Sequence, residues 1–224
     1  MTAISSLRTG SVAASRVVGG GGTTSLDYYF TSGKPGGMVD VEVTPSTGTT
    51  PTVIVDSTTL REGAMTSGSG GYNLHAVMPT DMTIATSISV TVTVGSYSSD
   101  ANNRAVGPGV FSSDGSSGVY VRFASFSSSC VLYTWDGSSE TSRATSSQRA
   151  TAGDTATLTG TLSSGTWTWT VKKNGGDDIA ALTWADSGHV IDLPGSHPGI
   201  AFRTQRSGSN FYSRGVTRIV AAST

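Results

Sequence analysis

The sequence predicts an all-β fold, an antiparallel β-sandwich of the jelly-roll type with an extended N-terminal arm. Short segments in which apolar and polar residues alternate recur along the chain, and this period of two is typical of strands with one buried face. Clusters of turn residues separate about twelve such segments, whereas no helical period persists for more than about two turns. The 29 glycines and a charged fraction of 13% also favour strands and turns over helices.

The start of the chain differs from the rest. We therefore divide the chain into an attachment arm with a Gly-rich linker (residues 1–26) and a β-sandwich domain (residues 27–224). In the first segment, isolated apolar residues lie among Ser, Thr, Ala and Arg, and four glycines follow them. The candidate anchoring residues are Ile4, Leu7, Val12, Val17 and Val18. We interpret this segment as an arm that becomes ordered against a partner, and a disordered leader is the alternative.

The first strands are expected at residues 39–43, 52–60, 71–78 and 87–94. In the last of these, "SISVTVTV", every second residue is Ile or Val and the residues between them are Ser or Thr. A strand that is polar on one side belongs to an antiparallel sheet with one solvated face. The segment after it contains Pro108, which predicts an edge strand or a bulge because proline cannot donate a ladder hydrogen bond.

A strand at 119–126 displays two different faces. Val119, Val121 and Phe123 alternate with Tyr120 and Arg122, so one face is apolar and the other presents an aromatic ring and a guanidinium. The second face is therefore a candidate binding surface. The next strand, 130–135, begins with the single cysteine of the chain, which we expect to be a buried core residue.

The last third of the chain contains the hairpin around which we organise the fold. Trp167, Trp169 and Val171 alternate with threonines, and "NGG" at 174–176 predicts a tight turn into a second apolar run that ends at Trp184. The polar stretch 136–154 could hold another short strand, but its pattern does not show which of its residues would face the core. The segments 200–205 and 214–222 are expected to close the sandwich, and the final one to pair with a strand far back in the sequence.

From about Thr52 onward the order of elements resembles the concanavalin A-like lectin/glucanase (laminin G-like) jelly roll, in particular the versions in minor tail and other virion proteins of actinobacteriophages. The resemblance rests on "SISVTVTV", "VGPGVFSSDGSSGVYVRF", "CVLYTW", "TATLTGTLSSGTWTWTVKKNGG" and "HPGIAFR". The opening "SSLRTGSVAASRVVGGGG" is similar to leader segments of some phage minor tail proteins.

This resemblance implies a non-enzymatic structural protein of a phage virion, located in the tail or tail tip. Its N-terminal arm would hold it to other virion proteins, and it would form a homo-oligomer that follows the symmetry of the particle. The lectin-like sandwich would serve adhesion to a host-surface polysaccharide. A capsid decoration protein and a stand-alone carbohydrate-binding module are alternatives that the sequence leaves open.

Two sets of residues are candidates for ligand contact. The first is aromatic, because flat rings match the apolar C–H faces of sugars, with a core position as the alternative. This set is Tyr120, Tyr133, Trp135 and Trp184. The second set is a group of arginines near the C-terminus, which we interpret as a solvated rim, with a site for an anionic sugar as the alternative. These are Arg203, Arg206, Arg214 and Arg218.

We expect no catalytic residues, metal site or cofactor. The glucanases of the resembling fold use paired glutamates, but Glu42, Glu62 and Glu140 are isolated in the sequence. Asp177 and Asp178 lack the spaced oxygen ligands of a calcium site, and no nucleophile elbow accompanies the three histidines. The net charge of −1 argues against nucleic-acid binding, and no apolar run approaches the roughly 20 residues that span a membrane.

Overall fold

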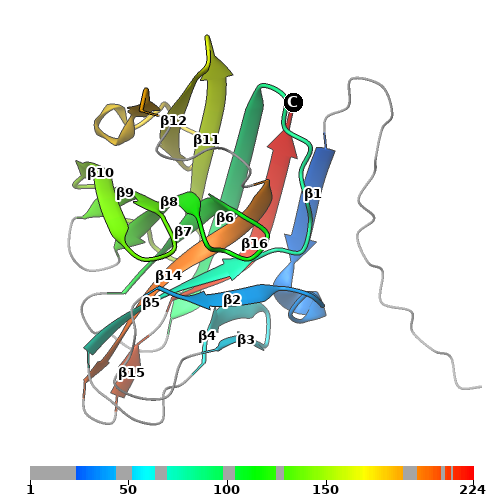
Figure 1. Cartoon of the computed structure of the whole chain (residues 1–224). Coiled ribbons are helices and arrows are strands. Elements are labelled where there is room, and N and C mark those ends of the chain that lie inside the picture. Colours follow the sequence, from blue (N-terminus) through cyan, green and yellow to red (C-terminus); the bar gives the residue numbers. More distant parts are fainter. Residues whose placement is uncertain are drawn as a thin grey trace, which may run out of the picture.

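A computed structural model describes residues 24–43, 52–63, 70–97, 104–124, 129–188, 196–207, 210–212 and 214–224. These residues form two antiparallel sheets stacked face to face, which confirms the predicted β-sandwich (Figure 1). Sixteen strands lie in this part of the chain, several of them only three or four residues long. Its helical content is limited to the 3-10 turns η1 (Phe30–Ser32) and η2 (Ala180–Leu182).

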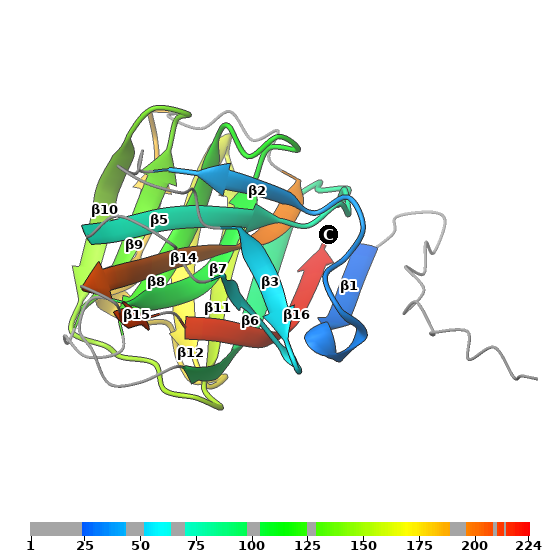
Figure 2. The ribbon, with the colours of Figure 1, turned by 90° about the horizontal axis from the view of Figure 1, so that it is seen from below.

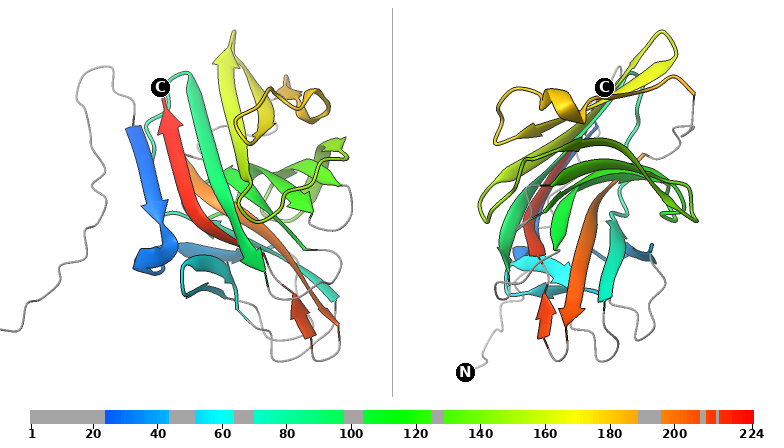
Figure 3. Two further views of the ribbon diagram at one scale, coloured as in Figure 1. Left: turned by 180° about the vertical axis from the view of Figure 1, so that it is seen from behind. Right: turned by 90° about the vertical axis from the view of Figure 1, so that its left-hand side faces the viewer.

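Sheet A has the order β13-β12-β11-β6-β16-β4-β3, and β1 also pairs with β16. Figure 3 shows β1, β16 and β6 side by side. The last strand of the chain therefore lies between strands that are far from it in sequence, as predicted. The strands of sheet A are β1 (Thr24–Tyr29), β3 (Val53–Asp56), β4 (Thr59–Glu62), β6 (Ser87–Tyr97), β11 (Thr155–Ser163), β12 (Thr166–Lys173), β13 (Trp184–Asp186) and β16 (Arg214–Ser223).

Sheet B has the order β10-β9-β8-β7-β14-β5-β2, and β15 pairs with β14. Its strands cross over those of sheet A when the molecule is seen from below (Figure 2). The segment expected to close the sandwich, β14, instead lies inside the sheet between β7 and β5. The strands of sheet B are β2 (Val39–Glu42), β5 (Gly70–Val77), β7 (Ala105–Phe111), β8 (Gly118–Ala124), β9 (Cys130–Trp135), β10 (Glu140–Ser146), β14 (His197–Ser207) and β15 (Asn210–Tyr212).

The apolar faces of the two sheets form one continuous core. On β6 the alternating residues Ile88, Val90, Val92 and Val94 are all buried, as the pattern predicted. On β8 the residues at 119, 121 and 123 point into the same core. Each large apolar side chain buried in this way stabilises the fold by about 2 kcal/mol, so the core needs no disulfide.

The predicted hairpin at 166–184 forms with an interrupted second arm. Asn174 and Gly175 adopt positive φ, as a tight turn after β12 requires. The chain then passes through η2 before β13 pairs with β12, where Trp184 lies opposite Trp169. The regular hairpin of this region is β11–β12, whose turn residues Ser164 and Gly165 also have positive φ.

Pro108 does not lie on an edge strand, which corrects the expectation from sequence. It lies on β7, opposite Ile200 of β14, and β8 covers the other side of the strand. The β7–β8 pairing is interrupted at positions 107 and 108 and resumes at Gly109 in the same register. The sheet therefore accommodates the missing N–H by a local break in one ladder rather than by a bulge.

The predicted domain boundary at residue 26 falls inside β1, because Thr24, Ser25 and Leu26 pair with the end of β16. The arm residues Ile4, Leu7, Val12, Val17 and Val18 lie outside the described residues, so the arm remains a prediction. In the described part of the chain, no helix has the length and apolar character needed to cross a bilayer.

Glu62, at the end of β4, is fully buried, and neither of its carboxylate oxygens has a hydrogen-bond partner among the described residues. Burial raises the pKa of this carboxyl well above its ordinary value, and the charge of Arg122 opposes the shift only in part. Because the folded form holds the proton more tightly than the unfolded form, Glu62 favours folding at low pH and weakens it as the pH rises.

We therefore expect Glu62→Gln to raise the thermal unfolding midpoint at pH 7 by about 4 °C, because the amide imitates the neutral acid without its ionisation cost. The difference from the wild type should vanish below about pH 4, where Glu62 is protonated in both states. Thermal unfolding followed by circular dichroism between pH 3.5 and 8 measures both effects. If the variant is less stable than the wild type at pH 7, the conclusion that Glu62 is a buried carboxylate without a hydrogen-bond partner is wrong.

Candidate functional site

The face of sheet B that points away from sheet A, here called the outer face, is strongly curved. Asn73 of β5 donates a hydrogen bond of 2.8 Å to Glu140 of β10, although β9, β8, β7 and β14 lie between these two strands. Side chains from opposite ends of the sheet meet only if the sheet bends toward them. The outer face is therefore a concave surface.

Glycines form the floor of this concave surface. Gly109, Gly118 and Gly199 belong to the neighbouring strands β7, β8 and β14. A Cβ atom at any of these positions would lie under 3.0 Å from the ring of Phe111. The ring therefore lies flat on the sheet because three strands carry no side chain beneath it, which gives a physical reason for "GPGVF", "SGVY" and "HPGI" in the sequence.

An aromatic cluster covers this floor. It consists of His75, Phe111, Tyr120, Tyr133 and Trp135. The ring of His75 lies 4.5 Å from that of Tyr120 and 4.6 Å from that of Phe111, and Tyr120 stacks on Tyr133 at 5.5 Å. Only Tyr133 is partly exposed among the five, so the outer end of the stack is the part that a ligand can reach.

The loop 112–117 closes one half of the outer face. Trp135 donates a hydrogen bond of 3.0 Å from Nε1 to the carbonyl of Gly115, and Asp114 accepts hydrogen bonds from Ser112 and Ser116 within the loop. These contacts leave Trp135 only 4% exposed. Trp135 therefore anchors the loop and offers no open ring face to a ligand.

Glu140 links the aromatic cluster to a buried guanidinium. Its carboxylate forms an ion pair with Arg122, with 3.0 Å between Nη1 and Oε1, and accepts a hydrogen bond of 3.0 Å from Nη2. It also accepts hydrogen bonds from the Tyr120 hydroxyl and from Asn73. Burial raises the pKa of Tyr120, which keeps that hydroxyl protonated and able to donate. The carboxylate of Glu140 thus accepts hydrogen bonds from side chains of both β5 and β8.

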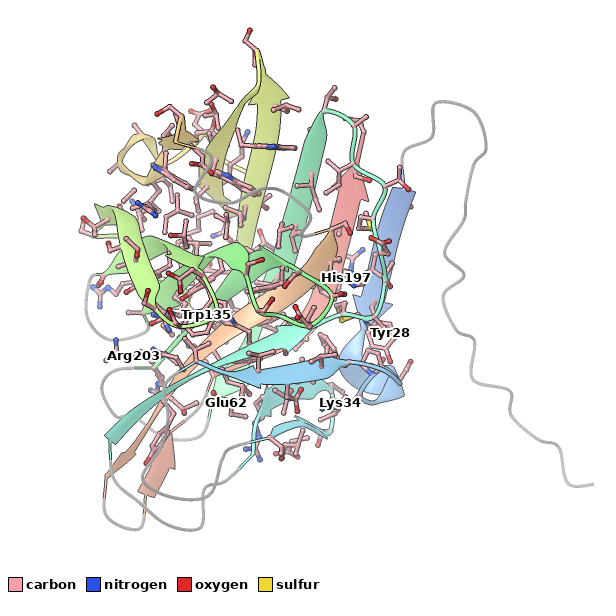
Figure 4. All side chains as sticks on the ribbon, viewed as in Figure 1. Tyr28, Lys34, Glu62, Trp135, His197 and Arg203 are labelled. Carbon is pink, nitrogen blue, oxygen red and sulfur yellow. The ribbon has the colours of Figure 1, made fainter. Side chains whose placement is uncertain are left out.

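The other half of the outer face is open. A half-open pocket of about 60 Å³ lies over the adjoining ends of β14, β7, β8 and β9. Its lining consists of Arg104, Ala105, Arg122, Ala124, Ser129, Val131, Tyr133 and Arg203. Figure 4 shows Arg203 and Trp135 at separate places on sheet B. The guanidinium carbon of Arg122 lies 4.4 Å from the centre of the Tyr133 ring, at the boundary between the two halves.

The structure brings together three of the four aromatic candidates and separates the fourth. Tyr120, Tyr133 and Trp135 share the outer face, but Tyr120 has no exposed surface. Trp184 lies on β13 at the edge of sheet A, where its ring is 5.0 Å from the guanidinium carbon of Arg143. Tyr133 is therefore the candidate that combines partial exposure with a pocket.

The C-terminal arginines also occupy different environments. Arg214 is buried and donates a hydrogen bond to the carbonyl of Ala150, so it is not part of a solvated rim. Arg218 pairs with Asp27 at 2.6 Å. Arg203 lines the pocket, and the side chain of Arg206 lies outside the described residues.

The other candidates have structural surroundings. Cys130 is buried as predicted, and burial raises the pKa of its thiol. Asp178 faces Lys172 at 3.8 Å, and Asp177 is exposed. Nδ1 of His197 lies 3.0 Å from the carbonyl oxygen of Met78. Across the described ranges, no group of three or more His, Cys, Asp or Glu side chains could hold a metal ion.

The histidine of the aromatic cluster leads to a pH prediction. Both ring nitrogens of His75 are buried without a hydrogen-bond partner among the described residues, and burial, followed by the charge of Arg122, lowers the pKa of His75 well below 6.5. As the pH falls below about 6.5, only the unfolded chain takes up this proton, and stability decreases by up to about 1.4 kcal/mol per pH unit.

We expect His75→Phe to remove this part of the acid destabilisation, because phenylalanine fills the ring site without binding a proton. Urea unfolding of the wild type and the variant at pH 7.5, 6.5, 5.5 and 5.0 measures the two slopes. The result that contradicts the prediction is an equal loss of stability in both proteins over this range.

Sequence reasoning missed Glu140, Asn73 and Arg104 as parts of the outer face. Glu140 lies within the polar stretch 136–154, whose alternation is weak, and the β9–β10 pairing shifts register between Ser142 and Ala144. The alternation of Tyr120 and Arg122 was the signal that pointed to the outer face of β8 as a candidate binding surface, which stays a prediction. Nothing in the local pattern connects β5 to β10, because their contact depends on the curvature of the sheet.

Comparisons with known proteins concern the fold. No protein-family model matches the sequence, and no curated protein sequence is significantly similar to it.

Among solved structures, peanut lectin with a nine-residue peptide has a TM-score of 0.47 and 14% identity, with 91% of this chain and 98% of the lectin covered. The metal-free form of the Emp46p carbohydrate recognition domain has a TM-score of 0.50 and 8% identity, with 77% and 85% covered. The carbohydrate-binding module CBM66 from Bacillus subtilis has a TM-score of 0.42 and 11% identity, with 81% and 96% covered. The two stacked antiparallel sheets and the similarity to the Emp46p domain identify the fold of this chain as the lectin-like, concanavalin A-type jelly roll.

Proposed function

We propose that this chain is a non-enzymatic carbohydrate-binding β-sandwich and that it contacts sugar at the open half of the outer face of sheet B. The observation that carries this proposal is the half-open pocket beside the partly exposed ring of Tyr133. An aromatic ring next to convergent polar donors matches a sugar, which has apolar C–H faces and a rim of hydroxyl groups. The concave shape of the sheet provides the surface on which several sugar residues can lie.

A glycan array probed with the whole protein tests this function. We expect binding to at least one class of cell-envelope polysaccharide, with affinity reduced about tenfold by Tyr133→Ala and largely retained by Tyr133→Phe. Trp135→Ala is a poor probe, because this side chain holds the loop 112–117 in place. If the protein binds no glycan on the array, or if Tyr133→Ala leaves its binding unchanged, the proposal that this face binds sugar is wrong.

The surroundings of Glu62 and Glu140 support a non-enzymatic role. Hydrolysis of a glycosidic bond uses two carboxyl groups about 5–10 Å apart on either side of the bond. Glu140 is held by Arg122, Tyr120 and Asn73, and Glu62 is fully buried on sheet A. The expected result of incubating the purified protein with any polysaccharide that it binds is therefore no release of reducing ends, and sustained turnover contradicts this.

We also propose that the protein belongs to a bacteriophage particle, in the tail or tail tip. The sequence resemblance to actinobacteriophage virion proteins and the predicted N-terminal arm support this location. A capsid decoration protein and a stand-alone module remain the alternatives. Mass spectrometry of purified particles is expected to find the chain at a fixed ratio to other virion proteins and in a multiple that fits the particle's symmetry. Its absence from the particles overturns the virion role and leaves sugar binding intact.

A further inference from the structure

The pocket on the outer face has a lining of one charge sign. It includes the guanidinium-bearing residues Arg104, Arg122 and Arg203, and no acidic side chain. This is unusual in a chain whose charged fraction is 13% and whose net charge is −1. Cationic groups gathered in a half-buried, partly desolvated recess create a positive potential that favours an anion.

Arg203 is the accessible member of this set. It lies on β14, opposite Ala105 of β7 and Asn73 of β5, and its side chain is partly exposed. No acidic residue of the described part of the chain forms an ion pair with it. Its guanidinium therefore has donors available on the pocket side.

Arg122 supplies a second set of donors from the base of the pocket. The side chain is 3% exposed, and Glu140 neutralises it from one side. Its Nη1 lies 3.0 Å from Oε1 of Glu140, and the side chain lines the pocket. A guanidinium carries five N–H donors, and Glu140 occupies only those that face it, so an anion in the pocket can accept from the donors on the other side.

The recess is small and half open. Its volume of about 60 Å³ has room for a group such as a carboxylate or phosphate. Val131, Ala105 and Ala124 provide apolar walls, and Tyr133 lies at the rim. A ring that carries such an acidic group could therefore place the group in the recess and lie against the tyrosine.

We propose that this pocket selects acidic sugars, and that Arg203 and Arg122 bind the anionic group while Tyr133 contacts the ring that carries it. This inference rests on the proposed carbohydrate-binding function and specifies its ligand class. The planar fork of a guanidinium can bind either a carboxylate or a phosphate through two hydrogen bonds. The anionic group can thus belong to a uronic acid or to a sugar phosphate, and the experiment separates these sources.

Isothermal titration calorimetry with matched ligands provides the test. The carboxylate probes are oligogalacturonate and hyaluronan fragments, each compared with its carboxyl-reduced neutral counterpart, and the phosphate probe is a 6-phosphorylated mannose disaccharide, compared with the dephosphorylated disaccharide. We expect at least one acidic probe to bind at least about tenfold more tightly than neutral oligosaccharides. Its affinity should fall as the salt concentration rises from 50 to 300 mM, because the contact is ionic.

Arg203→Ala is the decisive variant, since this side chain is partly exposed and its loss is not expected to unfold the sheet. It should weaken binding of the acidic probe about tenfold or more, and Arg203→Lys should restore part of the loss. The matched control is Arg149→Ala, which removes the same charge from an exposed position after β10 and should leave the affinity unchanged.

Three results overturn the inference in distinguishable ways. If neutral counterparts bind as tightly as acidic ligands, or if Arg203→Ala and Arg149→Ala act alike, the acidic specificity is wrong while sugar binding stands. If no oligosaccharide binds, acidic or neutral, the proposed function fails together with the inference.

Discussion

Replacing Glu140 by alanine is expected to lower the free energy of unfolding by about 3–5 kcal/mol, because it leaves a buried charge without its partner. Arg122 is 4% exposed and has Glu140 as its ion-pair partner. The same change removes the acceptor for the Tyr120 hydroxyl and for Asn73. Urea unfolding monitored by tryptophan fluorescence at pH 7 measures the loss.

Two controls separate this cause from a general effect of losing a carboxylate. The double variant Glu140→Ala, Arg122→Met should recover part of the stability, since no orphaned charge remains. Asp56→Ala breaks the exposed pair with Arg61, in which the two side chains are 57% and 22% exposed, and should cost less than about 1 kcal/mol. A loss below about 1 kcal/mol for Glu140→Ala would show that the network does not stabilise the outer face.

Gly199→Ala is expected to cost about 3 kcal/mol, the upper end of the usual range for overpacking. The added Cβ would lie 2.7 Å from the carbonyl oxygen of Ala76 and 2.7 Å from the Phe111 ring. The backbone cannot easily move away, because β14 pairs with β5 on one side and β7 on the other. Thermal unfolding should show a clearly reduced midpoint.

The matched control is Gly36→Ala, where no atom lies within 4 Å of the added carbon and the stability should change by less than about 0.5 kcal/mol. Phe111→Leu combined with Gly199→Ala should recover only part of the loss, because the contact with the Ala76 carbonyl remains. Equal midpoints for Gly199→Ala and Gly36→Ala are incompatible with a tightly packed glycine floor.

Alternation in the sequence predicted the sandwich and many of its faces. The pattern on β6 correctly separated core from surface, because a period of two shows which side chains share a face. On β8 it grouped the side chains by face, but all seven residues of that strand are buried. Strand order could not be predicted in the same way. The position of β14 inside sheet B and of β16 between β1 and β6 depends on contacts across the whole chain, which local patterns do not contain.

The candidate site was predicted in part. The sequence placed Tyr120 and Arg122 on the face of β8 opposite Val121, and this grouping is confirmed, but both side chains are buried there rather than displayed. It could not show that the loop 112–117 folds back to cover Trp135, or that Glu140 reaches Asn73 across the curved sheet. It also could not separate Arg203, which faces a pocket, from Arg214, which is buried against Ala150. These differences arise from curvature and loop packing rather than from residue type.

The most direct test of the account is a crystal structure of the protein with a bound acidic oligosaccharide. We expect the anionic group within about 3 Å of the guanidiniums of Arg122 and Arg203, with a sugar ring against Tyr133. A ligand bound instead beside Trp184, or on sheet A with the pocket residues untouched, would contradict it.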